Sequence, residues 1–398
     1  MKKKLLLFIT PYKFRHFDWS RFEFSYLEKK FNTKIIIHEL IDFIYPHFKK
    51  VYLNTMKSKK VYSFKNFNQW KKAIHKLLNK NNKIILFTSL KCENLISFLI
   101  LKELKKYNVS YFNFGSDQNP ELRKQVSGEF LKKLKRAIFR PKKIIHFLNQ
   151  KIFHFLGKIY KLHPTYSIQA GSRGFMYNKK QTKAIKGNSY DYSNFLIESC
   201  KNKKKKKRDC IIFLEAPGPK FKGDSAMTFD DESDFCTKEN WYPSLVKFFD
   251  VIEKVTKLKV KIAPHPKVKH KKFPKYYGGR EVLNEKLSKS SFRAKVIISR
   301  SSTGFSYAVA HKIPSIMIYS NEISMNKIFF NDKIKHFARE LGVTPINIDA
   351  KLKSNNIKKL LKINYQSYKN YKSRYLTSRF DSKYNHEIIQ DLMNAEHK

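Results

Sequence analysis

A histidine held between two prolines is the first feature of this sequence that suggests chemistry. His265 lies in the run Pro264-His265-Pro266-Lys267, directly after residues 259–263, whose alternating pattern is typical of a strand. Prolines restrict the backbone on both sides, so the imidazole is rigidly aimed and can donate a hydrogen bond to a phosphate oxygen. Lys267 adds a positive charge beside it. A His-Pro pair also commonly ends a strand and begins a loop without any functional role, so by itself it indicates only a candidate phosphate contact.

A hydroxyl-rich segment follows the next predicted strand, 295–299. It contains Ser301, Ser302, Thr303 and Gly304 and leads into a predicted helix. Hydroxyls and free backbone N–H groups at a helix start favour an anion site, although the same residues also serve as a plain helix cap. Because the carboxyl ends of parallel strands meet at one edge of a sheet, we expect this segment and His265 to grip one nucleotide phosphate.

Three carboxylates are candidates for acid–base chemistry. Glu215 ends the predicted strand 210–214, Asp224 follows it, and Asp117 comes after the predicted strand 110–114. A carboxylate at a strand end can deprotonate an acceptor hydroxyl or attack a sugar carbon. It can also orient sugar hydroxyls or balance nearby lysines, and Asp117 is equally suited to a turn. The acidic run 230–234 is a weaker candidate. The carboxylates near residues 215–234 could also bind a cation. The four scattered cysteines have no paired spacing, so they indicate no zinc site, and no resident metal is expected.

Strand and helix patterns alternate in two blocks along the chain, from residue 5 to 114 and again from 210 to 348. This alternation predicts an α/β protein with two doubly wound, Rossmann-like domains that face a central cleft. Neither block carries a Gly-x-Gly-x-x-Gly or a Gly-Lys-Ser/Thr motif, so a nicotinamide dinucleotide and P-loop chemistry are excluded and no cofactor is expected. The periodicity further predicts helices over 22–31 and 282–289 and a helical tail over 356–393.

The charge is strongly unbalanced. The 398 residues include 83 Lys or Arg and 32 Asp or Glu, a net charge of +51, which predicts attraction to a polyanion or reflects compositional drift. Residues 130–190 contain no acid, and residues 131–162 have the amphipathic pattern of a helix that lies on an anionic membrane. The alternative is a basic, partly exposed helical pair within the first domain. No stretch reaches the roughly 18–20 apolar residues of a membrane span, and the apolar run at the start is too short for a signal peptide.

Several segments carry a family resemblance. Residues 241–250, 261–267, 276–280 and 296–314, with 189–192 and 212–215 upstream, resemble bacterial surface-carbohydrate (capsule and O-antigen) biosynthesis proteins, which belong among the GT-B glycosyltransferases. The His-Pro and Ser-Ser/Thr pairing also resembles sialyl-, polysialyl- and Kdo transferases, which use CMP-activated sugars. The resemblance covers about residues 189–318, and Glu215 stands where the related sequences usually carry Asp.

The resemblance implies a GT-B architecture and a division of roles. We expect an acceptor-side domain over 1–190, a nucleotide-sugar-binding domain over 205–350, and C-terminal helices over 351–398 that pack back toward the first domain. It implies that His265, Pro266 and Lys267, with Ser301 to Gly304, hold the donor. Related enzymes supply the base from the N-terminal domain, where Asp117 is the candidate.

The expected activity is transfer of a sugar, an ulosonic acid, from a CMP-activated donor to a glycan or glycolipid acceptor of lipopolysaccharide or capsule synthesis. We expect a cytoplasmic enzyme, peripherally attached to the anionic inner face of the cytoplasmic membrane, with no nucleic-acid partner. Two alternatives stay open. One is the same architecture with a UDP-sugar or CDP-glycerol donor. The other is a basic nucleic-acid-binding protein, against which the two strand–helix alternations argue.

Overall fold

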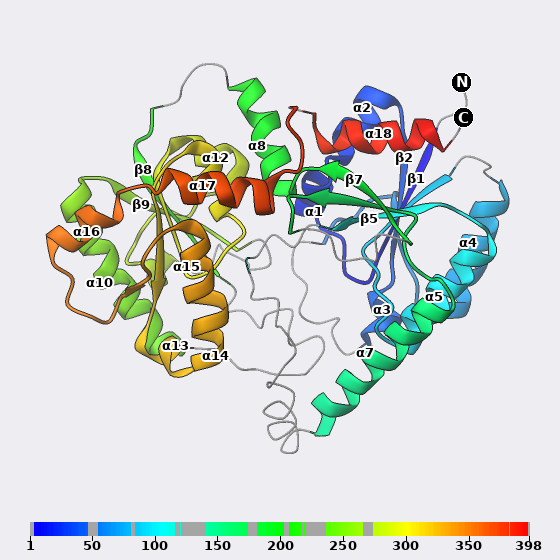
Figure 1. The fold of residues 1–398 in the computed structure, drawn as a ribbon, viewed down its shortest axis with the longest axis horizontal. Helices are drawn as coiled ribbons and strands as arrows, with labels where there is room; N and C mark the ends of the chain where they lie inside the picture. The colour runs from blue at the N-terminus through cyan, green and yellow to red at the C-terminus, as the bar shows by residue number, and fades with distance from the viewer. Residues whose placement is uncertain are drawn as a thin grey trace.

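Two parallel sheets, each covered by helices, form the body of the molecule (Figure 1). The computed structural model describes residues 4–46, 55–80, 84–115, 120, 141–173, 181–202, 207–216, 219, 236–265, 274–381 and 383–396. The first sheet has seven strands in the order β3-β2-β1-β4-β5-β6-β7, and the second has five in the order β12-β11-β10-β8-β9. The predicted fold class, two doubly wound α/β domains, is therefore confirmed.

The N-terminal sheet is buried on both faces. Every residue of β1 is buried, as in a parallel sheet covered on both sides. The helices α3, α4 and α5 cover one face, and α2 and α18 cover the other. Its strands are β1 (Leu5–Thr10), β2 (Lys34–Glu39), β3 (Val61–Ser63), β4 (Ile84–Thr88), β5 (Tyr111–Gly115), β6 (Tyr166–Ala170) and β7 (Lys183–Gly187), and its helices are α1 (His16–Arg21), α2 (Phe24–Phe31), α3 (Ile41–Ile44), α4 (Phe67–Lys80), α5 (Leu95–Lys106) and α7 (Pro141–Ile159).

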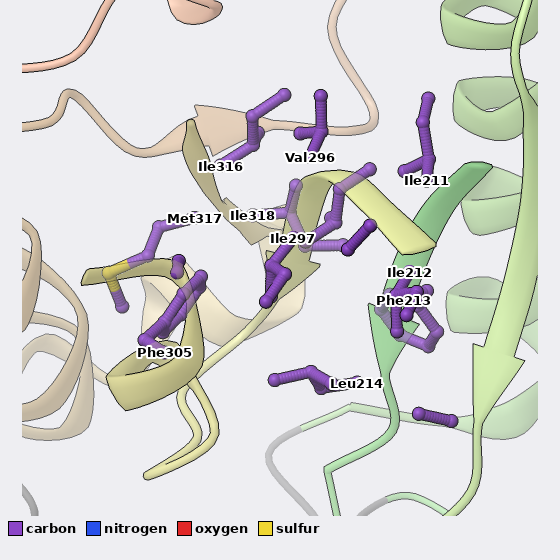
Figure 2. Packing of buried hydrophobic residues seen from close by; sticks show 14 of the residues in the cluster. Ile211, Ile212, Phe213, Leu214, Val296, Ile297, Phe305, Ile316, Met317 and Ile318 are labelled. Carbon is purple, nitrogen blue, oxygen red and sulfur yellow. The ribbon is translucent and has the colours of Figure 1, made fainter. Parts of the chain in front are cut away.

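The C-terminal sheet has one large apolar core. Figure 2 shows side chains of β8, β10 and β11 in this core, together with Phe305 of α12. The strands are β8 (Cys210–Leu214), β9 (Lys259–Ala263), β10 (Ala294–Ser299), β11 (Ser315–Tyr319) and β12 (Ile346–Asn347). The helices are α10 (Lys238–Thr256), α11 (Leu287–Ser290), α12 (Phe305–His311), α13 (Asn321–Met325), α14 (Lys327–Phe329), α15 (His336–Leu341), α16 (Ser354–Leu360) and α17 (Tyr365–Tyr371).

Two chain segments cross between the sheets side by side. The first leads from β7 into α8 (Tyr190–Lys201), and the second leads from residue 376 to α18 (Asn385–Ala395). Asn188 ties them together: its Nδ2 donates to the Lys383 carbonyl at 2.7 Å, and its Oδ1 accepts from the Thr377 hydroxyl at 2.7 Å. The helices α16 and α17 pack on the C-terminal core, whereas Ile389 and Met393 of α18 are buried in the N-terminal core.

Three predicted helices differ from the observed ones. The helix predicted over 22–31 is observed as α2 but begins later, at Phe24, because Glu23 has a left-handed φ of 59° and its buried carboxylate accepts from His386 Nδ1 at 2.6 Å. The helix predicted over 282–289 is wrong for its first half, since Val282 forms a parallel bridge with Ile262. The predicted helical tail is interrupted at residues 377–384, where the chain crosses between the sheets.

Candidate functional site

A cavity of about 1180 Å³ lies between the carboxyl edges of the two sheets. Its N-terminal wall comes from the end of β1 and from residues 12–22, including α1. Its C-terminal wall comes from the ends of β8 and β9, from residues 283–288 and from residues 301–304. The first turn of α8 closes it where the chain crosses between the domains. This is the edge at which ligands of doubly wound sheets bind.

All described residues of the predicted site line this cavity. They come from three neighbouring strand ends: Glu215 after β8, His265 after β9, and Ser301, Ser302, Thr303 and Gly304 after β10. Asp117, Asp224, Pro266, Lys267 and the acidic run 230–234 lie outside the described residues, so their roles stay predictions. The structure thus brings together the two segments that the sequence places 35 residues apart, His265 and the hydroxyl-rich segment.

Glu215 is buried and holds the strand ends in position. Its carboxylate accepts the main-chain N–H of His265 at 3.3 Å and the hydroxyl of Tyr277. Burial, with the nearby Glu215 charge, raises the pKa of the Tyr277 hydroxyl far above its ordinary value, so this tyrosine stays a hydrogen-bond donor. Since the bond to residue 265 is made by the main chain, Glu215 fixes the backbone from which the His265 imidazole projects.

The segment 301–304 is tightly packed under the cavity. A side chain at Gly304 would place its Cβ 2.6 Å from Cδ1 of Leu214, so any larger residue here requires the Leu214 side chain to move. The Ser302 hydroxyl accepts the Gly304 N–H at 3.1 Å, which is a local capping interaction. The Thr303 side chain hydrogen-bonds to the carboxylate of Asp191 on α8. The hydroxyl segment therefore contacts the crossover helix as well as its own domain.

Asp191 occupies an unusual position for a carboxylate. It follows the Ser189 cap at the start of α8 and lines the cavity where the two domains meet. Burial raises the pKa of the Asp191 carboxyl, against the opposing effects of the Arg21 charge and the Thr303 hydrogen bond. Arg21, whose guanidinium lies 4.8 Å from the Tyr190 ring centroid, brings a positive charge from the N-terminal wall to the same place.

The N-terminal wall presents mostly polar side chains. Arg15 binds Asp18 through Nε at 2.8 Å and through its main-chain N–H at 3.1 Å, which holds the first turn of α1. His16, the first residue of α1, is exposed into the cavity. The domains also touch directly, since the Lys286 ammonium donates to the Ser20 hydroxyl. Among the described residues, no group of three or more His, Cys, Asp or Glu side chains has the arrangement of a metal site.

Comparison with known proteins gives the architecture its name. No family model matches the sequence, and no curated protein matches it. Among solved structures, the wall teichoic acid polymerase TagF soaked with CDPG aligns over 100% of this chain and 90% of its own, with a TM-score of 0.55 at 12% identity. The UDP-GlcNAc 2-epimerase from Methanocaldococcus jannaschii aligns over 98% and 99%, with a TM-score of 0.50 at 13% identity. The fold is GT-B. At these identities the likeness shows the fold and assigns no family.

Sequence reasoning found one wall of the GT-B cavity and missed the other. His16, Arg21 and Asp191 were not predicted as site residues. The segment 189–192 was part of the family resemblance, and its acid at the crossover was the available signal for Asp191. His16 and Arg21 lie on α1, a helix of six residues that follows β1. Its one buried residue is Asp18, so the sequence has no apolar periodicity that would predict this helix. The position after the first strand of a doubly wound sheet was the available signal there.

Proposed function

We propose that this chain is a GT-B transferase that moves a group from a nucleotide-activated donor to a hydroxyl of a glycan or glycolipid acceptor. The observation that carries the proposal is the convergence of His265 and residues 301–303 on one wall of a cavity whose other wall belongs to the second domain. Its volume of about 1180 Å³ exceeds the roughly 300–1,000 Å³ of a small-ligand pocket, which leaves room for a donor and the reacting end of an acceptor.

The donor that we favour is a nucleoside diphosphate donor, either a UDP-sugar or CDP-glycerol. The GT-B structures to which this chain is similar include an enzyme named for UDP-GlcNAc and a polymerase soaked with CDPG. This supports the diphosphate alternative better than the CMP-linked ulosonic acid expected from the sequence. The CMP-sugar remains the second candidate, because the His-Pro and Ser-Ser/Thr pairing resembles CMP-sugar-dependent transferases.

In the proposed mechanism the C-terminal wall holds the leaving group. The acceptor oxygen forms a bond to the transferred group, the bond from that group to the nucleotide phosphate oxygen breaks, and the electron pair leaves with the nucleotide. His265 and the hydroxyls of residues 301–303 stabilise the charge that develops on the departing phosphate, as Lys267 would beside them. Glu215 positions His265 through the main chain.

We assign the proton of the acceptor hydroxyl to His16. It faces the cavity from the wall opposite the donor residues, where an acceptor would enter, and histidine is the commonest general base. Asp18, the carboxylate two residues on, is already paired with Arg15. Glu215, Asp117 and Asp224 remain the alternative bases, and the last two lie outside the described residues.

Binding of unlabelled nucleotides tests the donor class. Saturation-transfer NMR with CMP, CDP and UDP, followed by calorimetry, should show one nucleotide bound clearly more tightly than the others. Incubation of the matching donor without acceptor is the control, because conversion of a UDP-sugar without any acceptor would identify an epimerase. If none of the three nucleotides binds, the proposal is wrong.

Replacement of Ser302 and Thr303 by alanine should weaken nucleotide binding at least tenfold. Each hydroxyl bond to a buried phosphate contributes about 1–3 kcal/mol. Calorimetry measures the loss. Ser320→Ala is the matched control, because Ser320 caps α13 by accepting the Ile323 N–H and does not line the cavity. If both variants bind nucleotide as the wild type does, the hydroxyls of the segment serve only to cap α12.

Asp191→Asn should strengthen binding of a diphosphate donor at least about threefold at about pH 8. To donate its hydroxyl hydrogen to a phosphate, Thr303 must give up its bond to Asp191, and the phosphate would be repelled by the Asp191 carboxylate while that group is charged. Since burial raises the pKa of Asp191, the repulsion is present above that raised pKa and is lost as the pH falls through it. A UDP-sugar suits the measurement, because its two phosphates keep a constant charge in this range.

The difference between the variant and the wild type should therefore shrink between about pH 8 and an acidic pH below the raised pKa of Asp191. Comparing the two proteins at each pH removes effects that they share, including protonation of histidines. Weaker binding by Asp191→Asn at both pH values would instead identify the carboxylate as a ligand of the donor.

A further inference from the structure

An apolar stripe runs along the outer face of α7. Five of its side chains are half or more exposed: Ile145 (59%), Leu148 (51%), Ile152 (52%), Phe155 (62%) and Ile159 (57%). Their spacing of three and four residues places them within an arc of about 80° at 100° per residue. Large apolar side chains that are exposed together, rather than singly, mark an interaction surface.

A second, neighbouring face of α7 fastens the helix to its domain. Phe153 and Leu156 pack against the N-terminal core, and the Phe153 carbonyl accepts from the Cys92 thiol at 3.1 Å. At Gly157 an added Cβ would lie 3.1 Å from Cys92, so the helix approaches closely here. Figure 1 shows α7 beside α5 at the outer edge of the N-terminal domain. The apolar stripe thus has a fixed orientation, away from the core that holds the helix.

The charge around the stripe has one sign. α7 contains no acidic residue, and the exposed Lys151 and Lys158 lie about 80–100° to one side of the stripe's centre. In a chain of net charge +51, this surface is complementary to an anionic partner.

We propose that the apolar stripe of α7 docks into the boundary between headgroups and acyl chains of an anionic membrane. A 19-residue helix is about 28 Å long, and this one would lie parallel to the surface, with its stripe among the acyl chains and its lysines at the lipid phosphates. Within the described residues, no helix is long and apolar enough to cross a bilayer. This inference does not depend on the proposed transfer reaction.

A second copy of this chain is the competing occupant, since spacing by three and four also suits a helical partner. Pairing two α7 helices would bring lysines of like charge together with no acid on either helix to neutralise them. Anionic lipid accommodates both the stripe and the lysines, and for this reason we favour the membrane. The proposal also refines the expectation from sequence, which rested on the basic amphipathic pattern of residues 131–162. Within that segment, Lys132, Lys133, Lys135 and Arg136 lie outside the described part of the chain.

Sedimentation with vesicles of equal parts phosphatidylglycerol and phosphatidylcholine tests the docking. The full-length variant Leu148→Gln/Ile152→Gln/Phe155→Gln should partition at least tenfold more weakly than the wild type, since glutamine keeps the helix propensity and removes the apolar surface. The matched control is Met325→Gln/Tyr365→Gln/Phe380→Gln, which removes three other exposed apolar side chains and should bind vesicles as the wild type does.

Salt separates the two contributions to binding. At about 1 M salt, where the Debye length falls to about 3 Å, the wild type should retain part of its binding and the stripe variant should lose it all. A Trp placed at Ile152 should shift its emission to shorter wavelength with these vesicles, and nucleotide binding by the stripe variant should stay unchanged.

Equal partitioning of the stripe variant and the wild type, or complete release of the wild type by salt, would overturn the proposal. A wild-type dimer that the stripe variant converts to monomer, in a protein that ignores vesicles, would overturn it in favour of a second copy.

Discussion

Transfer should fall at least about a hundredfold in the variant His265→Ala, without loss of the fold. The imidazole lies on the donor wall of the cavity, beside the hydroxyl segment, and removal of one preorganised donor to a developing charge costs about 10²–10³ in rate. The expected loss is in kcat more than in KM, because the interaction strengthens as charge builds up on the leaving phosphate. Steady-state kinetics with the donor selected by the nucleotide screen provide the measurement.

Structural damage can be separated from this loss. The bond between residue 265 and Glu215 uses the main-chain N–H, so alanine at 265 retains it, and the thermal midpoint should stay unchanged. His265→Asn, which restores a side-chain N–H donor, should recover part of the activity. If the transfer rate of His265→Ala stays within threefold of the wild type, His265 has only a structural role in the loop.

The sequence carries strong information about the fold because the two sheets are parallel. Strands such as Leu5–Thr10 and Cys210–Leu214 are buried along their whole length, so they appear as continuous apolar runs separated by amphipathic helices. The strands β6 and β7 lack such runs and were not predicted. β7 lies at the sheet edge with only Gly187 buried, so its Lys183–Gly187 sequence has no reason to be apolar.

The later start of α2 and the interruption of the C-terminal helical tail depend on contacts distant in sequence. No residue near Glu23 predicts its left-handed backbone conformation, because His386, the buried partner of its carboxylate, is 363 residues away. The interruption of the tail likewise depends on the hydrogen bonds of Asn188 to Thr377 and Lys383. Local periodicity records burial along one element, and it contains no information about such pairings.

In the candidate site, too, the sequence predicts the residues that follow recognisable strands and misses those that depend on contacts between the domains. His265 and residues 301–303 follow strands that are easy to recognise, and parallel topology then places them together. Asp191 belongs to a helix that faces both domains, and its raised pKa arises from burial where those domains meet. The sequence pattern of one domain could not predict that Asp191 lines this cavity, because the N-terminal wall that it faces, residues 12–22, lies more than 160 residues earlier in the chain.

His16→Ala should lower kcat by about 10²–10⁴ while nucleotide affinity stays within twofold of the wild type. His16 faces the donor residues from the opposite wall, so its loss removes the group that takes the acceptor proton and leaves the donor contacts in place. The first turn of α1 should survive, because Arg15 and Asp18 hold it through side-chain and main-chain bonds. Single-turnover kinetics and calorimetry measure the two quantities.

Two further measurements distinguish a base from a structural histidine. Added imidazole should partly restore the activity of His16→Ala, since a small base can enter the space left by the side chain, and it should not affect His265→Ala in the same way. His75→Gln is the matched control, because His75 is an exposed histidine on α4 outside the cavity lining and should keep full activity. Should His16→Ala retain wild-type kcat, the base must be sought among the carboxylates, with Asp117 and Asp224 the first to replace.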